Sequence, residues 1–270
     1  MADCTHNCSS CGQKCDSRKG PKKLPKDTGK SKIKKVYAVV SGKGGVGKST
    51  VTATLASIAN KKGFKVAVLD ADVTGPSIPR LFGVTERAEA VADGILPVKK
   101  NGVKIMSANL LLEKETDPVV WRGPVLANVV QQFWNDVYWG DVDVMFIDMP
   151  PGTGDVPLTV YQSLPIDGII IVSTPQQLVS MIVQKAVEMA KLMDIKIVGL
   201  VENMSYMNCP HCDEKLYPFG ESQLSKTANQ LQVFNAVQLP FDHVVTRLSD
   251  QGKVQEVEIR QIEELFEELN

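Results

Sequence analysis

The fold of this chain of 270 residues is decided by residues 36–54, VYAVVSGKGGVGKSTVTAT. An apolar run at 36–40 predicts a strand, and Lys48-Ser49-Thr50 open a predicted helix. Glycines separate the two elements, and they allow consecutive backbone N–H groups to turn inward around an anion. The pattern is Gly-x-x-x-x-Gly-Lys-Ser/Thr between a strand and a helix, which predicts a phosphate-binding P-loop.

The P-loop predicts how a nucleotide and its metal are held. The unpaired N–H groups and partial positive charge of the helix start favour phosphate. Lys48 is expected to reach the β- and γ-phosphates, and the Ser49 hydroxyl is expected to bind Mg²⁺. The residues that we expect around the phosphates are Gly42, Lys43, Gly44, Gly45, Val46, Gly47, Lys48, Ser49 and Thr50.

A second lysine, Lys43, lies at the start of the glycine run. Lys48 already serves the phosphates within one chain, so Lys43 has two interpretations. It is either a solvated side chain, or it reaches a nucleotide bound to a partner chain, as an arginine finger supplied in trans does. The second interpretation makes Lys43 a catalytic residue that acts across a dimer.

Acidic residues follow two predicted strands. Asp70 and Asp72 come after an apolar run at 65–69, and Asp148 closes the buried run at 144–147. Open α/β sheets bind ligands at the carboxyl ends of their strands. Isolated acids are often caps or turn formers, but here we expect Asp72 to orient the attacking water and Asp70 to hold the loop or the metal shell. Asp148 is expected in the Mg²⁺ shell, as in the Walker B arrangement.

Two further features follow strands on the same side. Gly152, in the turn after Asp148, has an N–H that can contact the terminal phosphate, so the turn would move when that phosphate leaves. Asn203 follows the predicted strand at 196–201, and its amide can pair with an adenine edge through a donor and an acceptor.

Alternating strands and helices predict an α/β fold with a mostly parallel sheet and helices on both faces. Further strands are expected at 103–107, 168–173 and 236–240, and helices at 49–62, 123–137, up to 193, 221–231 and from 254. The aromatic residues near the second helix are expected in the core or at a dimer surface: Trp121, Phe133, Trp134 and Trp139.

Composition excludes several classes of protein. The apolar fraction of 43% is typical of a globular chain. Residues 1–35 carry ten Lys or Arg against three Asp, a charge of +7, and the other 235 residues carry 20 against 28, a charge of −8. The main domain is therefore not expected to bind nucleic acid, and its acidic C-terminal helix does not suit an anionic membrane. With no bilayer-length apolar run or signal peptide, we expect a cytoplasmic protein.

The chain divides into an N-terminal cysteine motif at 1–17, a basic flexible linker at 18–34 and a P-loop domain at 35–270. The motif contains Cys4, Cys8, Cys11 and Cys15. In a reducing compartment such a cluster favours metal over disulfides, and four thiolates suffice for zinc or for an iron–sulfur cluster. A flexible linker of this length has a reach of roughly 25 Å, so the tail is expected to hold a second cluster or to hand one over.

Cys209 and Cys212 form a Cys-x-x-Cys pair, with His211 between them as a spacer. They are half of a four-ligand metal site. The other ligands come from elsewhere in the chain, or a two-fold dimer joins two pairs as a Cys₄ site. A redox dithiol is the remaining alternative. The dimer agrees with a trans role for Lys43, because both place a partner chain at the same edge of the sheet.

The sequence SGKGGVGKST, with Lys43, resembles the deviant Walker A loop of the MinD/ParA/nitrogenase-iron-protein superfamily. DADVTGPSIP, WRGP, DMPPGTGD, STPQ, ENMS and CPHC, in this order, resemble the Mrp/ApbC iron–sulfur cluster carrier ATPases over residues 34–270. The N-terminal cysteines resemble the added cluster motif of the eukaryotic cytosolic scaffolds.

The resemblance implies a homodimeric ATPase that uses ATP and Mg²⁺. It also implies that Cys209 and Cys212 bind a [4Fe–4S] cluster between subunits and that the cluster passes to apo-proteins, with cluster assembly or donor proteins as further partners. It supports the roles given to Lys43, Lys48, Ser49, Asp72, Asp148 and Asn203. Two other functions remain open, a zinc-stabilised MinD/ParA-like nucleotide switch and a nitrogenase-iron-protein-like electron-transfer ATPase.

Overall fold

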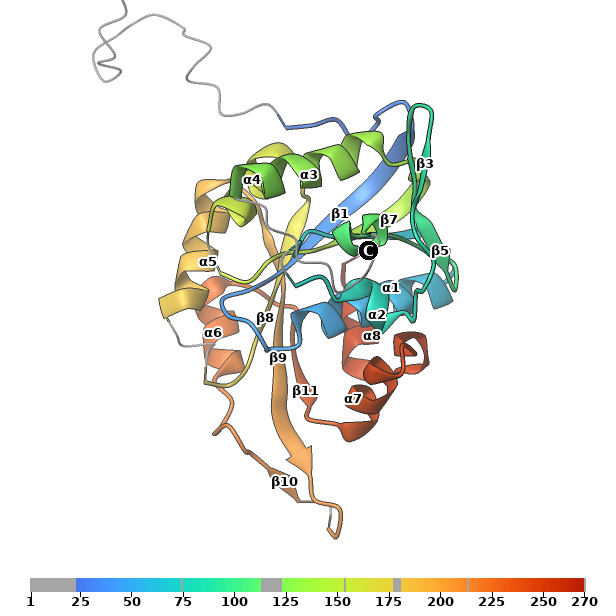
Figure 1. Cartoon of the computed structure of the whole chain (residues 1–270). Helices are drawn as coiled ribbons and strands as arrows, with labels where there is room; N and C mark the ends of the chain where they lie inside the picture. The colour runs from blue at the N-terminus through green and yellow to red at the C-terminus, as the bar shows by residue number, and fades with distance from the viewer. Residues whose placement is uncertain are drawn as a thin grey trace, which may run out of the picture.

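The computed structural model describes residues 23–73, 75–112, 123–152, 154–176, 181–212 and 214–269 (Figure 1). The strands are β1 (Ser31–Ser41), β2 (Val66–Asp70), β3 (Glu89–Val91), β4 (Gly94–Leu96), β5 (Val98–Lys100), β6 (Val103–Met106), β7 (Gly140–Asp148), β8 (Gly168–Ser173), β9 (Ile197–Asn208), β10 (Lys215–Leu216) and β11 (Ala236–Pro240). The helices are α1 (Lys48–Lys61), α2 (Ile78–Leu81), the 3₁₀ turn η2 (Ala108–Leu111), α3 (Gly123–Asp136), α4 (Asp155–Ser163), α5 (Met181–Leu192), α6 (Leu224–Leu231), α7 (His243–Asp250), the 3₁₀ turn η3 (Val254–Glu256) and α8 (Arg260–Glu267).

A nine-stranded sheet forms the centre of the domain. Its order is β10-β9-β8-β1-β7-β2-β6-β5, with β11 also paired to β9. All pairs are parallel except β5 with β6 and β10 with β9 at the two ends of the sheet. The fold expected from the sequence, a mostly parallel sheet in an α/β domain, is confirmed.

Helices cover both faces of the sheet (Figure 1). One face packs against α3, α4, α5 and α6, and the other packs against α1, α2 and α8. Alternate residues of β1 belong to the two cores, with Ala38 on the first side and Val39 on the second. A strand buried on both faces needs apolar residues at every position, which explains the continuous apolar run that begins at Val36.

Several elements differ from expectation. β1 begins at Ser31, five residues before the expected strand at 36. β9 was expected to end at 201 but continues to Asn208, because β11 pairs with it on both sides of residues 203–205. Helices α4 and α7 were not anticipated. Phe133, Trp134 and Trp139 lie in the core as predicted, whereas Trp121 is outside the described residues.

Residues 24–27, which we call the strap, are hydrogen-bonded to the helical layer that contains α3 and α4. The Leu24 N–H donates to the Ser163 carbonyl at 2.7 Å, and the Trp134 indole N–H donates to the Pro25 carbonyl at 3.0 Å. Lys26 Nζ lies 2.6 Å from an oxygen of Asp167, which also accepts the N–H of Val36. The strap therefore lies where β8 begins, at the amino-terminal edge of the sheet. Within the described residues, no helix has the length and apolarity needed to cross a bilayer.

Candidate nucleotide site and cysteine hairpin

The P-loop joins the end of β1 to the start of α1, at the carboxyl edge of the sheet. Gly45 and Gly47 have φ angles of 80° and 82°, a region that other residues rarely adopt. A cavity of about 280 Å³ lies over the loop, and its walls include Lys43, Ser49 and Asp72. The structure thus brings together the predicted phosphate loop and the predicted water-orienting acid.

Asp148 is the centre of the polar contacts under this cavity. Its Oδ2 lies 2.8 Å from Lys48 Nζ and accepts the Ser49 hydroxyl at 2.6 Å, while its Oδ1 accepts the Thr52 hydroxyl at 2.8 Å. Hydroxyl and carboxylate oxygens are the ligands that Mg²⁺ prefers, so Ser49 and Asp148 fit the metal role expected of them. Thr52 was not singled out in the sequence, because its position one helical turn after Lys48 is also that of an ordinary helix residue.

Asp70 is completely buried beside this group. Its carboxylate accepts the N–H of Asp72 at 3.2 Å, the N–H of Ile78 at 3.3 Å and the Ser107 hydroxyl at 3.2 Å. Burial, followed by the nearby Asp148 carboxylate, raises the pKa of Asp70 well above its usual value. These contacts agree with a loop-holding role, because they fix the segment that carries Asp72.

The residues expected to act on the γ-phosphate occupy different surroundings. Asp72 is 9% exposed, and its Oδ1 accepts the N–H of Gly75 at 3.3 Å. Lys43 is exposed at the surface of the loop, where its carbonyl accepts the Ser41 hydroxyl. The Gly152 N–H, expected at the terminal phosphate, donates to the Ser41 carbonyl at 2.9 Å. In this structure the turn at Gly152 is therefore hydrogen-bonded to the end of β1, the strand that precedes the P-loop.

Asn203 contacts the P-loop directly. Its Nδ2 donates to the Val46 carbonyl at 2.9 Å, and its Oδ1 accepts the N–H of Met204 at 3.0 Å. A Cβ atom at Gly47 would lie 2.2 Å from Asn203 Nδ2, so this approach requires glycine. Asn203 thus holds the backbone of the loop, and its predicted pairing with adenine remains a prediction.

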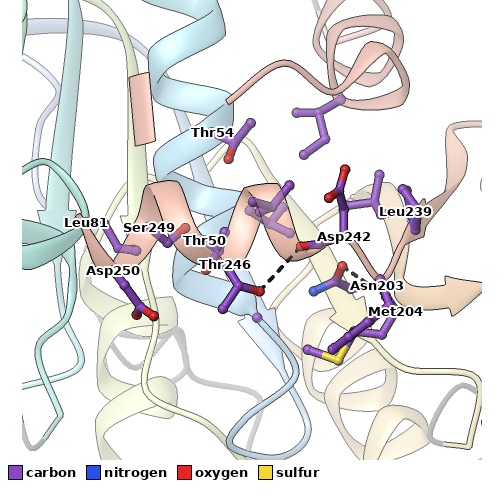
Figure 2. Close-up of a pocket in the computed structure, with 16 residues that line it drawn as sticks. Thr50, Thr54, Leu81, Asn203, Met204, Leu239, Asp242, Thr246, Ser249 and Asp250 are labelled. Atoms are coloured by element: carbon purple, nitrogen blue, oxygen red, sulfur yellow. Dashed lines mark hydrogen bonds between the residues drawn. The ribbon is translucent and has the colours of Figure 1, made fainter. Parts of the chain in front are cut away.

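A second cavity, of about 240 Å³, opens beside the P-loop and shares Gly47, Thr50 and Leu81 with the first (Figure 2). Its other walls come from α1, from the bend after Asn203, and from the segment between β11 and the end of α7. The lining residues labelled in Figure 2 are Thr50, Thr54, Leu81, Asn203, Met204, Leu239, Asp242, Thr246, Ser249 and Asp250.

The chemistry of the second cavity suits a nucleobase. The Thr54 and Ser249 hydroxyls are buried and have no hydrogen-bond partner within the described part of the chain. Leu239 and Met204 supply apolar surface for a flat ring. Asp242 accepts the N–H of Val244 at 2.7 Å and thereby caps α7, which places Thr246 over the cavity. The α7 residues were missed in the sequence because nothing in their local pattern signals a ligand.

Cys209 and Cys212 lie in the turn between β9 and β10. We call residues 206–216 the cysteine hairpin, which projects beyond the helical layers (Figure 1). The Cys209 N–H donates to the Glu214 carbonyl at 3.0 Å and closes the turn. Hydrogen bonds from the backbone N–H of His211, the Cys212 side chain and the Cys212 N–H lower the pKa of the Cys209 thiol.

The hairpin alone does not complete a metal site. Cys212 is exposed and Cys209 is partly exposed. Within the described residues, no group of three or more His, Cys, Asp or Glu side chains is close enough to hold a metal ion. Cys4, Cys8, Cys11 and Cys15 lie outside the described residues. That Cys209 and Cys212 are half of a four-ligand site therefore stays a prediction.

Comparisons with known proteins agree with this geometry. A ParA family model, described as NUBPL iron-transfer P-loop NTPase, matches residues 32–270. The iron–sulfur cluster carrier protein of Clostridium perfringens is 46% identical over 93% of this chain and 94% of its own length. The carrier of Methanocaldococcus jannaschii is 44% identical over 93% of this chain and 90% of its own.

Solved structures of nucleotide-binding proteins are also similar to this chain. A nucleotide-binding protein from Archaeoglobus fulgidus, solved in complex with ADP, is 42% identical, with a TM-score of 0.78 over 87% of this chain and 92% of its own. The cell division ATPase MinD of Pyrococcus furiosus is 21% identical with a TM-score of 0.61, over 87% and 98% of the two chains, and shares the fold.

Proposed function

Because the chain belongs to the ParA family of NUBPL iron-transfer P-loop NTPases, we propose that it is an iron–sulfur cluster carrier that binds and hydrolyses ATP. We further propose that it transfers a [4Fe–4S] cluster to apo-proteins. The observation that carries this proposal is the combination of two features in one domain. The first is the cradle, the group of contacts among Lys48, Ser49 and Asp148 under the first cavity. The second is the Cys-x-x-Cys pair on the projecting cysteine hairpin.

The cradle supports nucleotide binding with Mg²⁺. Lys48 turns from Asp148 to the β- and γ-phosphates, while the Ser49 hydroxyl and the Asp148 carboxylate hold the metal. When bound, Mg²⁺ neutralises phosphate charge. The second cavity takes the adenine, between Met204 on one side and α7 on the other.

Hydrolysis needs groups on both sides of the γ-phosphate. Asp72 lines the phosphate cavity and orients the attacking water. Lys43 is exposed at the rim and reaches the nucleotide of a facing subunit, where its charge stabilises the transition state. A homodimer with its two P-loops face to face supplies both groups to each site.

The same dimer completes the cluster site. Each subunit contributes Cys209 and Cys212, and two pairs give the four thiolates that a [4Fe–4S] cluster requires. The exposure of both thiols favours a cargo that is passed on, because an acceptor's cysteines can approach the cluster. Apo iron–sulfur proteins and cluster donors are the proposed partners, nucleic acid and membrane are not, and the proposed compartment is the cytoplasm.

Anaerobic reconstitution with iron and sulfide tests the proposal. We would compare the wild type, the double variant Cys209→Ser/Cys212→Ser and a control with Cys4, Cys8, Cys11 and Cys15 changed to Ser. Absorbance and Mössbauer spectra identify the cluster, and light scattering gives the mass. We expect the double variant to hold one [4Fe–4S] cluster per dimer fewer than the wild type, and the control without the N-terminal cysteines to retain that cluster. Equal cluster content in the double variant would refute the bridging site, and tight zinc binding without a cluster would favour the nucleotide switch.

A further inference from the structure

One strand, β9, carries both functional regions. Asn203 and Met204 form part of the wall of the second cavity, and Cys209 directly follows Asn208, the last residue of the same strand. The six residue steps from Asn203 to Cys209 span about 20 Å of extended chain. Any change in the course of the strand after Met204 therefore reaches the cysteine hairpin.

β9 is interrupted between these two regions by a bulge. Gln238 of β11 pairs with Glu202, and Pro240 pairs with Tyr206, so two steps along β11 oppose four steps along β9. Met204 lies in the extra length and has a φ of 54°, a left-handed conformation that a non-glycine residue rarely adopts. We call residues 202–206 the bulge.

The bulge contacts the nucleotide site from two sides. Asn203 donates to the Val46 carbonyl of the P-loop, and Asn203 and Met204 face the second cavity (Figure 2). At the other end, the Tyr206 carbonyl accepts the N–H of Phe241 at 2.7 Å, and Phe241 also lines that cavity. The cavity wall thus includes two residues of the bulge, Asn203 and Met204, and also Phe241, which is hydrogen-bonded to the far end of the bulge.

A buried side chain inside the bulge, Glu202, has only part of its hydrogen-bonding capacity filled. Glu202 is fully buried, and its Oε1 accepts the Ser205 hydroxyl at 2.5 Å. Its Oε2 is also buried and has no hydrogen-bond partner in the part of the chain that the structure describes. A buried oxygen without a partner destabilises this arrangement relative to one that supplies a partner. An arrangement of the bulge that gives Oε2 a partner would therefore gain stability, and a ligand that favours such an arrangement would select it.

We propose that the bulge is a positioning element, and that through it the cysteine hairpin responds when a nucleotide base occupies the second cavity. The base presses on Met204 and on the contact between Phe241 and Tyr206, and the strand carries the change to Cys209. This inference rests on the proposed function, since it takes a nucleotide as the occupant. It deepens that function by assigning the signal to the base, so ADP acts as ATP does, whereas phosphates without a base do not.

Hydrogen–deuterium exchange of the full chain, free of metal cluster, tests the proposal. We would compare no ligand, Mg-ADP and Mg-pyrophosphate, using the amides of residues 42–50 as a monitor of binding. The variant Met204→Gly removes the side chain that faces the cavity, and it lets the backbone adopt either sign of φ without strain. Gln232→Gly is the matched control, since Gln232 has a φ of 55° at the end of α6, outside the bulge.

We expect ADP to slow exchange in residues 206–216 by roughly threefold or more in the wild type and in Gln232→Gly. Because Met204 faces the second cavity, Met204→Gly is compared at ADP concentrations that protect residues 42–50 as fully as in the wild type, and there the hairpin no longer responds. Equal hairpin protection by pyrophosphate, or by ADP in Met204→Gly, would overturn the inference, as would an unresponsive hairpin in the ADP-bound wild type. If Met204→Gly does not fold, the comparison of ADP with pyrophosphate in the wild type decides. Failure of ADP to protect residues 42–50 would count against the proposed function itself.

Discussion

Lys48 Nζ lies 2.8 Å from Asp148 Oδ2, and the two side chains are only 6% and 0% exposed. The lysine that we propose binds the phosphates is thus already paired within the protein. Phosphate binding exchanges one anionic partner for another, so it does not have to overcome the cost of burying a bare ammonium group. The pair also links nucleotide affinity to the stability of the unliganded domain.

Asp148→Asn is expected to lower the free energy of unfolding by about 3 kcal/mol without nucleotide, because Lys48 stays buried without its counter-charge. It should also weaken Mg²⁺-dependent ATP binding. Urea unfolding and titration calorimetry measure the two effects. Asp143→Asn is the control, because Asp143 lies 2.7 Å from Lys34 in an exposed pair whose loss should change stability far less. Equal losses in the two variants would contradict the prediction.

Gly47→Ala is expected to be more damaging than Gly45→Ala. Both residues have φ near 80°, so both substitutions introduce backbone strain of about 1–3 kcal/mol. Only at Gly47 does the new Cβ meet Asn203, at 2.2 Å, whereas nothing lies within 4 Å of it at Gly45. Thermal unfolding without nucleotide should therefore rank Gly47→Ala below Gly45→Ala, and a reversed order would show that the Asn203 contact is not tight in solution.

Asp70 gives a prediction about pH. Its pKa is raised by burial and then by Asp148, so the folded protein holds a proton that the unfolded chain releases above a pH of about 3.8. Stability contributed by this proton is present at low pH and is lost as the pH rises through the raised pKa. In urea unfolding without Mg²⁺ or nucleotide, Asp70→Asn should flatten the fall in stability with rising pH.

Asp143 provides a control of opposite sign. A hydrogen bond from Lys34, followed by one from the N–H of Lys65, lowers the pKa of Asp143. Its stabilising effect is therefore present above its usual pKa and is lost as the pH falls through the lowered value. Asp143→Asn should flatten the acid side of the stability profile, whereas Asp70→Asn acts as the pH rises. The same pH response in both variants would contradict the assignment.

A mixing experiment tests whether Lys43 acts in trans. Lys43→Ala alone should bind ATP but hydrolyse it slower by a factor on the order of 10³, the effect of a missing arginine finger. Lys48→Ala alone should bind ATP poorly. Dimers that contain one subunit of each kind have one complete site, because the Lys48→Ala subunit supplies Lys43 to its partner. Recovery of hydrolysis on mixing is the expected result, and its absence would assign Lys43 to its own subunit.

The parts of the site that depend on local pattern could be predicted from sequence. Gly47, Lys48 and Ser49 were identifiable because they lie next to one another in one strand-to-helix turn, and Asp148 because it closes an apolar strand. The structure brings these residues together as the spacing implied. The parallel sheet was also predictable, since continuous apolar runs such as 36–40 are required where both faces are covered.

Contacts between distant segments could not be predicted. Asn203 meets Val46 across 157 positions of sequence, and neither residue signals the other. Asn203 and Ser205 interrupt the apolar run, so the strand was expected to end there, whereas pairing with β11 carries β9 through the bulge to Asn208. The α7 wall of the second cavity depends on how the C-terminal segment packs over α1, which no local spacing encodes.

The strap at 24–27 gives the domain a fixed reference point. It is bound to Ser163, Trp134 and Asp167 at the edge of the sheet where β8 begins, and the cysteine hairpin lies beyond the opposite edge (Figure 1). A fluorophore attached at Lys23, beside the strap, and a second one on the hairpin would be separated by the length of the sheet. Energy transfer between them would therefore act as a ruler for movement of the hairpin during cargo loading and release.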